Sequence, residues 1–191
     1  MQHDYLLSKF VSRDETRPFL GCVFMDSKTK QAIATDGHRL FLSQSSYVKK
    51  LADKMLISEG NVRSHEKAAW LVHPDIKCDR FPTIQRIVEP AIKNNEKMLR
   101  FTVPMWLGDL KMKCHKVYIF VQDDGKLSLH DNDDVVFAIN GILLAELACE
   151  NITMFYNNDM RPILFFLNHD VMETTGHDHL GVIMPLKRDS L

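Results

Sequence analysis

The sequence consists largely of short apolar runs, each ended by turn-forming residues, and this pattern limits the folds that the chain can adopt. Residues 19–25 and 31–35 are apolar runs on either side of a polar turn at 26–30, which is the pattern of a β-hairpin. Asp36-Gly37 is the next turn, and residues 39–43 return as a third strand. Runs this short predict antiparallel sheets with a few helices packed against them, the α+β class.

The pattern begins again after a polar stretch at residues 93–97, which we interpret together with Pro82 and Pro90 as an inter-domain connector. Helices are predicted at 4–13, 46–54, 104–113 and 140–149. Further strands are predicted at 55–58, 62–65, 69–73, 98–103, 117–122, 126–130, 135–139, 152–156, 162–167 and 180–185. The two halves share this order of elements. We therefore predict two α+β domains of related architecture, residues 1–90 and 91–191.

The composition agrees with a globular protein that buries a core. Hydrophobic residues make up 45% of the chain and charged residues 26%. No segment approaches the roughly 18 uninterrupted apolar residues of a membrane span, and the first residues lack the basic start and apolar run of a secretory signal. We expect a cytoplasmic protein without membrane contact.

Cysteine spacing and charge exclude several classes of site. Cys22, Cys78, Cys114 and Cys149 include no C-x-x-C pair, which argues against a zinc knuckle and suits free thiols in a reducing compartment. Lys and Arg total 24 against 25 for Asp and Glu, a formal net charge of −1. A protein that holds DNA by overall charge is usually basic. Any contact with DNA must therefore come from charge placed on one surface.

Four blocks of sequence carry a family resemblance. Residues 34–40 read ATDGHRL, residues 79–82 read DRFP and are followed by Arg86-Ile87, and residues 137–147 lead into ENIT at 150–153. The last block is VIMPL at 182–186. In this order, over nearly the whole chain, they resemble the bacterial DNA sliding clamp, the beta subunit of DNA polymerase III. The resemblance implies the DNA-clamp fold, with helices on one face and antiparallel sheets on the other.

The resemblance is partial. Bacterial clamps carry three domains, and this chain has room for the middle and last ones. Residues 1–90 resemble a shortened middle domain and residues 91–191 the last domain. A conventional clamp is therefore not assumed.

In the family, a pocket between these two domains takes short peptides of DNA polymerases and of the clamp loader, which carry aliphatic and aromatic anchors. Such a pocket needs adaptable apolar walls and a few oriented polar groups. Arginines there can bond peptide carbonyls or a carboxylate, and a glycine lets a ligand approach the backbone. The resemblance assigns peptide binding to Phe19, Thr35, Gly37, His38, Arg39, Leu40, Pro82, Arg86, Ile87, Asn140, Leu143, Met160, Pro162, Val182, Ile183, Met184, Pro185 and Leu186.

Each block taken singly also has a purely structural interpretation. Asp-Gly is a common hairpin turn, and Arg39 could simply pair with Asp36 beside it. Only the joint order of the blocks favours a binding site.

The resemblance also implies a ring around double-stranded DNA, whose lining helices present Lys and Arg to phosphates without reading bases. The predicted DNA-facing cations are Lys9 and Arg13 on the first helix, Lys49, Lys50 and Lys54 on the second, and Lys111, Lys113 and Lys116 on or after the third. A two-domain subunit would close a six-domain ring as a homo-trimer. The alternatives are a homo-dimer, a monomer, and a clamp-like decoy or regulator that keeps the pocket without encircling DNA.

The nine histidines raise one enzymatic alternative. A metal-dependent phosphohydrolase needs His and Asp ligands that converge on a metal, and His-Asp pairs occur at His3-Asp4, His130-Asp131, His169-Asp170 and His177-Asp178-His179. The last three lie in turn-like surroundings. The chain also lacks a nucleophile elbow and a phosphate-cradling glycine-rich loop. We expect no catalytic residue, no metal and no cofactor.

Overall fold

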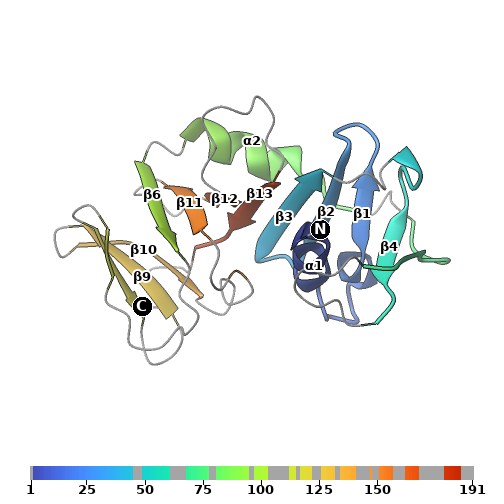
Figure 1. Ribbon diagram of the computed structural model, residues 1–191, viewed down its shortest axis with the longest axis horizontal. Helices are drawn as coiled ribbons and strands as arrows, with labels where there is room; N and C mark the ends of the chain where they lie inside the picture. The colour runs from blue at the N-terminus through green and yellow to red at the C-terminus, as the bar shows by residue number, and fades with distance from the viewer. Residues whose placement is uncertain are drawn as a thin grey trace. The chain divides into compact units, whose positions relative to one another are not determined.

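The computed structural model describes residues 2–44, 49–60, 68–77, 81–94, 97–102, 112–114, 117–121, 126–131, 134–140, 147, 151–156, 162–167 and 179–185 (Figure 1). The chain divides into two compact units. The first consists of Met1–Thr83 and Gly176–Gly181, and the second of Ile84–Thr175 and Val182–Leu191.

In its described residues, the first unit is an antiparallel sheet with one α-helix against it. Its elements are α1 (Gln2–Lys9), the short 3-10 helix η1 (Pro18–Gly21), β1 (Val23–Asp26), β2 (Gln31–Thr35), β3 (Arg39–Gln44), β4 (Met55–Ser58) and β5 (Trp70–Val72). The strands lie in the order β5-β4-β1-β2-β3, and every neighbouring pair among these is antiparallel.

The core of this unit lies between α1 and the two strands β2 and β3, which the helix contacts. The Phe10 and Phe41 rings are 5.4 Å apart between centroids, and both side chains are fully buried. Ala34 is paired with Phe41 across the two strands and therefore lies on the same face of the sheet. Its small side chain leaves room for the aromatic pair beneath the helix.

The predicted strands of the first half are confirmed where the structure describes them. β2 spans 31–35 and β4 spans 55–58, as the apolar runs predict, while β3 and β5 differ from prediction at their ends. The strand predicted at 62–65 lies outside the described residues.

Two helix predictions in this half are wrong in extent. The helix predicted at 4–13 ends at Lys9, so Arg13 follows it instead of lying on it. In the segment predicted to be a helix at 46–54, residue 49 is in a 3-10 helical conformation and residues 50–53 form turns and bends, while 45–48 lie outside the described residues. The backbone of this segment pairs with β1 instead: Asp53 N donates to Met25 O at 2.7 Å, and Met25 N donates to Lys54 O at 3.1 Å. Asp53 has φ of 56°, which a right-handed helix does not allow.

Phe19 is also not in a strand. The apolar run at 19–25 is divided between η1, which contains Phe19, and β1, which begins at Val23. Pro18 stands at the start of η1, where its fixed φ suits a helical turn and its missing N–H costs nothing.

The second unit is built mainly of strands. Its elements are α2 (Gln85–Asn94), β6 (Lys97–Thr102), β7 (Met112–Cys114), β8 (Val117–Val121), β9 (Lys126–Asp131), β10 (Asp134–Asn140), β11 (Asn151–Tyr156), β12 (Ile163–Leu167) and the second half of β13 (His179–Ile183). The strand order is β12-β11-β6 in one antiparallel set and β10-β9-β8-β7 in another. Helix α2 packs against β12.

The predicted strands of this half are confirmed, including the hairpin of β8 and β9. The connector predicted around Pro90 and residues 93–97 is wrong: α2 continues through Pro90 to Asn94, and β6 begins at Lys97. Proline removes one helical N–H, but packing of the half-buried Ile87 and Val88 offsets this loss.

Each of the two helices predicted in this half overlaps an observed strand at one of its ends. Residue 113, expected at the end of a helix, lies in β7, and Asn140, expected to begin one, ends β10. Residues 103–111, 141–146 and 148–150, which hold the rest of both predicted helices, lie outside the described residues. With antiparallel strands and few helices, the α+β class is confirmed.

Candidate functional site

The turn between β2 and β3 holds the largest group of predicted site residues, and its geometry is set by two side chains. Asp36 Oδ1 accepts hydrogen bonds from the backbone N–H of His38 at 2.9 Å and of Arg39 at 3.0 Å. Thr35 Oγ1 accepts from Gly37 N at 3.1 Å and donates to Arg39 O at 2.7 Å. Gly37 has φ of 94°, a conformation that favours glycine. The turn is therefore rigid from Thr35 to Arg39.

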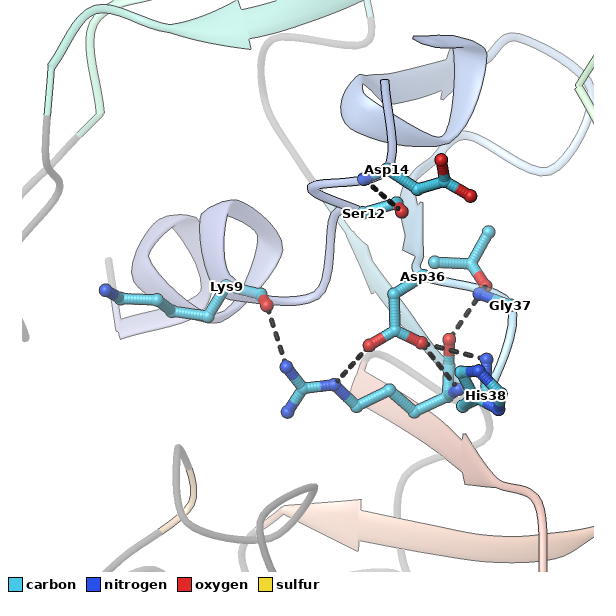
Figure 2. Close-up of polar contacts among 8 residues, drawn as sticks. Lys9, Ser12, Asp14, Asp36, Gly37 and His38 are labelled. Atoms are coloured by element: carbon cyan, nitrogen blue, oxygen red, sulfur yellow. Dashed lines mark hydrogen bonds and ion pairs between the residues drawn. The ribbon is translucent and has the colours of Figure 1, made fainter. Parts of the chain in front are cut away.

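Arg39 ties this turn to helix α1 (Figure 2). Its Nε donates to Asp36 Oδ2 at 3.0 Å, and its Nη2 donates to the Lys9 carbonyl oxygen at 2.9 Å, at the C-terminal end of α1, where carbonyls lack helical partners. The guanidinium carbon lies 4.3 Å from the centroid of the Phe10 ring, and the side chain is 9% exposed. The alternative in which Arg39 pairs with Asp36 is confirmed. Its position makes it a structural residue of the first unit.

A second Asp–Arg pair lies in the loop after α1. Asp14 accepts hydrogen bonds from Thr16 Oγ1 at 2.6 Å, from Thr16 N at 2.9 Å and from Arg17 Nε at 2.8 Å. Its own backbone N–H donates to Ser12 Oγ at 3.0 Å (Figure 2). The hydrogen bond from the Thr16 side chain, followed by that from Arg17, lowers the pKa of Asp14 from 3.8 to about 2. The carboxylate therefore stays ionised at neutral pH.

The loop and the turn meet at Gly37. A Cβ atom added to Gly37 would lie 3.1 Å from Arg17 Nη1, closer than an ordinary van der Waals contact. Gly37 is therefore suited to this position in two ways, by its positive φ and by the guanidinium beside it. Asp14 and Arg17 are not among the site residues predicted from the sequence. The signal for them was available: Asp14 and Arg17 have the same three-residue spacing as Asp36 and Arg39.

The remaining predicted peptide-binding residues differ widely in exposure. Leu40, Val182 and Ile183 are buried, and Met184 is 40% exposed. Pro82 and Arg86 are exposed, whereas Phe19, Ile87, Pro162 and Pro185 are half-buried. Asn140 is described only as the last backbone position of β10, and Leu143, Met160 and Leu186 lie outside the described residues. Within one unit, the structure brings together Thr35, Gly37, His38, Arg39 and Leu40.

Most of the predicted DNA-facing cations that the structure describes lie in loops, turns or a strand, and not on α-helices. Lys9 ends α1, with its Nζ 5.5 Å from the centroid of the Tyr5 ring. Four others are exposed in loops or turns: Arg13, Lys49, Lys50 and Lys54. Lys113 is in β7, and residues 111 and 116 lie outside the described part. The prediction that helices carry these cations is wrong for Arg13, Lys50, Lys54 and Lys113.

No cluster of three or more His, Cys, Asp or Glu side chains that could hold a metal occurs among the described residues. Of the histidine pairs, His130-Asp131 ends β9, and His169, Asp170, His177 and Asp178 lie outside the described part. His179 is described, and its Nδ1 lies 3.1 Å from Ser43 Oγ in the first unit. Among the described helices, none is long and apolar enough to span a membrane.

Comparison with solved structures identifies the fold. The beta chain of DNA polymerase III from Streptococcus pneumoniae matches 97% of this chain with a TM-score of 0.53 and 17% sequence identity. The protein has the DNA-clamp fold. A sliding clamp from Pseudomonas aeruginosa, solved with griselimycin bound, also matches 97% of the chain, with a TM-score of 0.49 and 11% identity. No protein-family model and no curated protein matches the sequence.

The similarity confirms the fold expected from the four sequence blocks. The matched region makes up 62% of the pneumococcal chain and 63% of the Pseudomonas chain, so this protein spans less than two thirds of either.

Proposed function

We propose that this protein is a sliding-clamp-like accessory factor of DNA replication or repair that binds short peptides of DNA polymerases and of a clamp loader. The observation that carries the proposal is the DNA-clamp fold over 97% of the chain. A second observation supports the proposal: the ATDGHRL block folds as a rigid turn, and His38 is exposed at the tip of that turn. A preorganised surface of this kind binds without the cost of ordering a loop.

The peptide-binding residues in this proposal are those named from the sequence, with a narrower role for Arg39. Its guanidinium is tied to Asp36, Lys9 and Phe10, so it holds the turn in place for its neighbours. His38, Arg86 and Met184 are exposed and are the residues we expect to touch a peptide directly.

The proposal is tested by fluorescence anisotropy with a labelled peptide that carries two leucines and one phenylalanine. We expect saturable binding that His38→Ala and Met184→Ala each weaken by about tenfold, the effect of removing a central contact. Leu71→Ala is the matched control, because Leu71 is 48% exposed on β5 and outside the predicted site. Absence of binding, or equal binding by all variants, contradicts the proposal.

Encirclement of double-stranded DNA by a homo-oligomeric ring is the second part of the proposal. The exposed Arg13, Lys49, Lys50 and Lys54 are the described cations that could face phosphates. Light scattering over a range of concentrations tests it. A trimer supports a six-domain ring, whereas a monomer at every concentration rules the ring out and favours a clamp-like decoy that sequesters peptides. Stoichiometric zinc or manganese that is lost in His177→Ala would instead favour the phosphohydrolase alternative.

A further inference from the structure

Strand β5 forms an edge of the first unit. It is the last strand in the order of this sheet, and its antiparallel partner β4 lies on one side of it. Glu59 N donates to Ala69 O at 2.7 Å, and His73 N donates to Met55 O at 2.8 Å. Because hydrogen-bonded positions alternate along an antiparallel pair, residues 69, 71 and 73 direct their backbone groups toward β4.

The same alternation turns the backbone N–H and C=O groups of Trp70 and Val72 away from β4. In the part of the chain that the structure describes, no strand pairs with them on that side. An uncovered row of backbone donors and acceptors is a template for a further strand. A strand that docks there must present its own donors and acceptors at the same spacing.

The side chains at this edge are apolar and exposed. Leu71 is 48% exposed and Val72 is 46% exposed, and Ile57, which is opposite Leu71 in β4, is also exposed. Leu71 and Ile57 therefore form an uncovered apolar pair on one face of the sheet. Trp70 and Val72 lie on the other face, where Val72 is opposite the buried Leu56. A docking strand would remove apolar surface from water on both faces.

The edge also lacks the charges that keep two copies of a strand apart. Residues 68–73 read AAWLVH and include no Asp, Glu, Lys or Arg. His73 is neutral in this geometry, because its Nδ1 accepts hydrogen bonds from the backbone N–H groups of Asp75 and Ile76, each at 3.2 Å. Natural edge strands are commonly protected by lysine, because an unprotected edge pairs with other chains. Two copies of this segment meet no like-charge repulsion.

A second copy of β5 fits this edge in one register. When two β5 strands run antiparallel with Leu71 on the two-fold axis, Trp70 of each copy is opposite Val72 of the other. Each such pair exchanges both of its N–H···O bonds, so every outward backbone group of the two residues gains a partner. The two Leu71 side chains meet at the axis, and each Val72 packs beside an indole of the other copy.

We propose that β5 is a self-association surface, at which two copies of this chain pair their β5 strands antiparallel about Leu71. Both copies use the same edge, so the contact closes at a dimer. Three residues from each copy make a small interface, and the dimer should therefore be weak and dissociate on dilution. This inference goes beyond the proposed peptide binding and does not depend on it.

Light scattering across a concentration series measures the association of the full chain. We expect wild type to pass from monomer to dimer. Leu71→Lys should raise the Kd of the dimer by about a hundredfold, because it brings two ammonium groups together at the axis. Val72→Pro should also weaken the dimer, since it removes an N–H that points away from β4. Ile92→Lys is the matched control: Ile92 is exposed on α2, outside this edge, and its replacement should leave the Kd unchanged.

Cysteine cross-linking tests the register. In the proposed pair the two Leu71 Cα atoms are about 4.5 Å apart, within the range of a disulfide, so Leu71→Cys should give a covalent dimer on mild oxidation. Ile57→Cys is the matched control, because Ile57 lies one strand farther from the axis in each copy, about 14 Å from its counterpart. Wild type, which keeps its four cysteines, sets the background.

Circular-dichroism spectra equal to that of wild type establish that the variants are folded. A monomer at every concentration overturns the proposal. A dimer or trimer that Leu71→Lys and Val72→Pro leave intact also overturns it, and a trimer of that kind supports the ring instead. Dimerisation without cross-linking of Leu71→Cys overturns the register. Peptide binding by Leu71→Lys should equal that of wild type, so loss of the dimer is measured separately from the proposed function.

Discussion

Two arginines in the first unit have the same local partner and opposite surroundings. Arg39 and Arg17 each donate Nε to an aspartate three residues earlier, at 3.0 Å and 2.8 Å. The Arg39 side chain is 9% exposed, over the Phe10 ring and against the Lys9 carbonyl, whereas the Arg17 side chain is 45% exposed. One guanidinium is part of the interior, and the other lies at the surface.

Burial of the side chains, and not the Asp–Arg spacing they share, therefore decides whether such a pair stabilises the fold. Breaking a buried pair leaves an uncompensated charge away from water, which is strongly destabilising. An exposed pair contributes little because water and salt screen it. The pair at 36 and 39 should therefore hold the fold, and the pair at 14 and 17 should shape a surface.

The largest expected effect comes from Arg39→Ala. Removal of the guanidinium takes the side-chain hydrogen bond from Asp36 Oδ2, takes another from the Lys9 carbonyl, and uncovers the Phe10 ring. We therefore expect a loss of about 3 kcal/mol in the free energy of unfolding. Urea unfolding followed by circular dichroism measures it. Arg17→Ala is the matched control and should stay within the uncertainty of the extrapolation. If Arg39→Ala and Arg17→Ala lose similar amounts of unfolding free energy, the two Asp–Arg pairs do not differ in their contribution to the fold.

Gly37→Ala should have the next largest effect. The φ of 94° costs about 1–3 kcal/mol for a residue with a side chain, and the new methyl group would also meet Arg17 Nη1. Gly60→Ala isolates the backbone cost, because Gly60 has φ of 77° and open space around the added Cβ. We expect Gly37→Ala to be the more destabilising of the two. In a protein that already carries Arg17→Ala, Gly37→Ala should destabilise no more than Gly60→Ala does. If Gly37→Ala is still the more destabilising there, a clash with the guanidinium is not the cause.

The smallest expected effect is the pH dependence of Asp14. Its folded pKa of about 2 lies below the ordinary value of 3.8, so its stabilising contribution is present above pH 4 and is lost as the pH falls toward 2. Wild type should exceed Asp14→Asn in unfolding midpoint at pH 6, and the difference should shrink between pH 4 and pH 2. Thermal melts of both proteins across this range provide the measurement. A difference that is constant with pH would contradict the depressed pKa.

Strands were predicted better from the sequence than helices, and the reason is local. The β2 and β4 segments are short apolar runs bounded by turn residues, and their length and flanking turns favour a strand over a helix. The segment at 49–54 has a helical pattern, yet it pairs with the backbone around Met25. Helix α2 was missed because Pro90 and its polar neighbours suggested a connector, whereas packing on β12 stabilises a helix there.

At the candidate site, the Asp36-Gly37 turn could be predicted from the sequence, because the positive φ of Gly37 and the hydrogen bonds to the Asp36 side chain involve only neighbouring residues. It also carried the four blocks that resemble a sliding clamp, whose fold the structure has. The roles of the two arginines depend instead on contacts between residues that are distant in the sequence. Phe10 and the Lys9 carbonyl reach Arg39 from about thirty residues away, and the space beside Gly37 receives Arg17. Such contacts depend on how α1, its following loop and the sheet pack together, which no local pattern specifies.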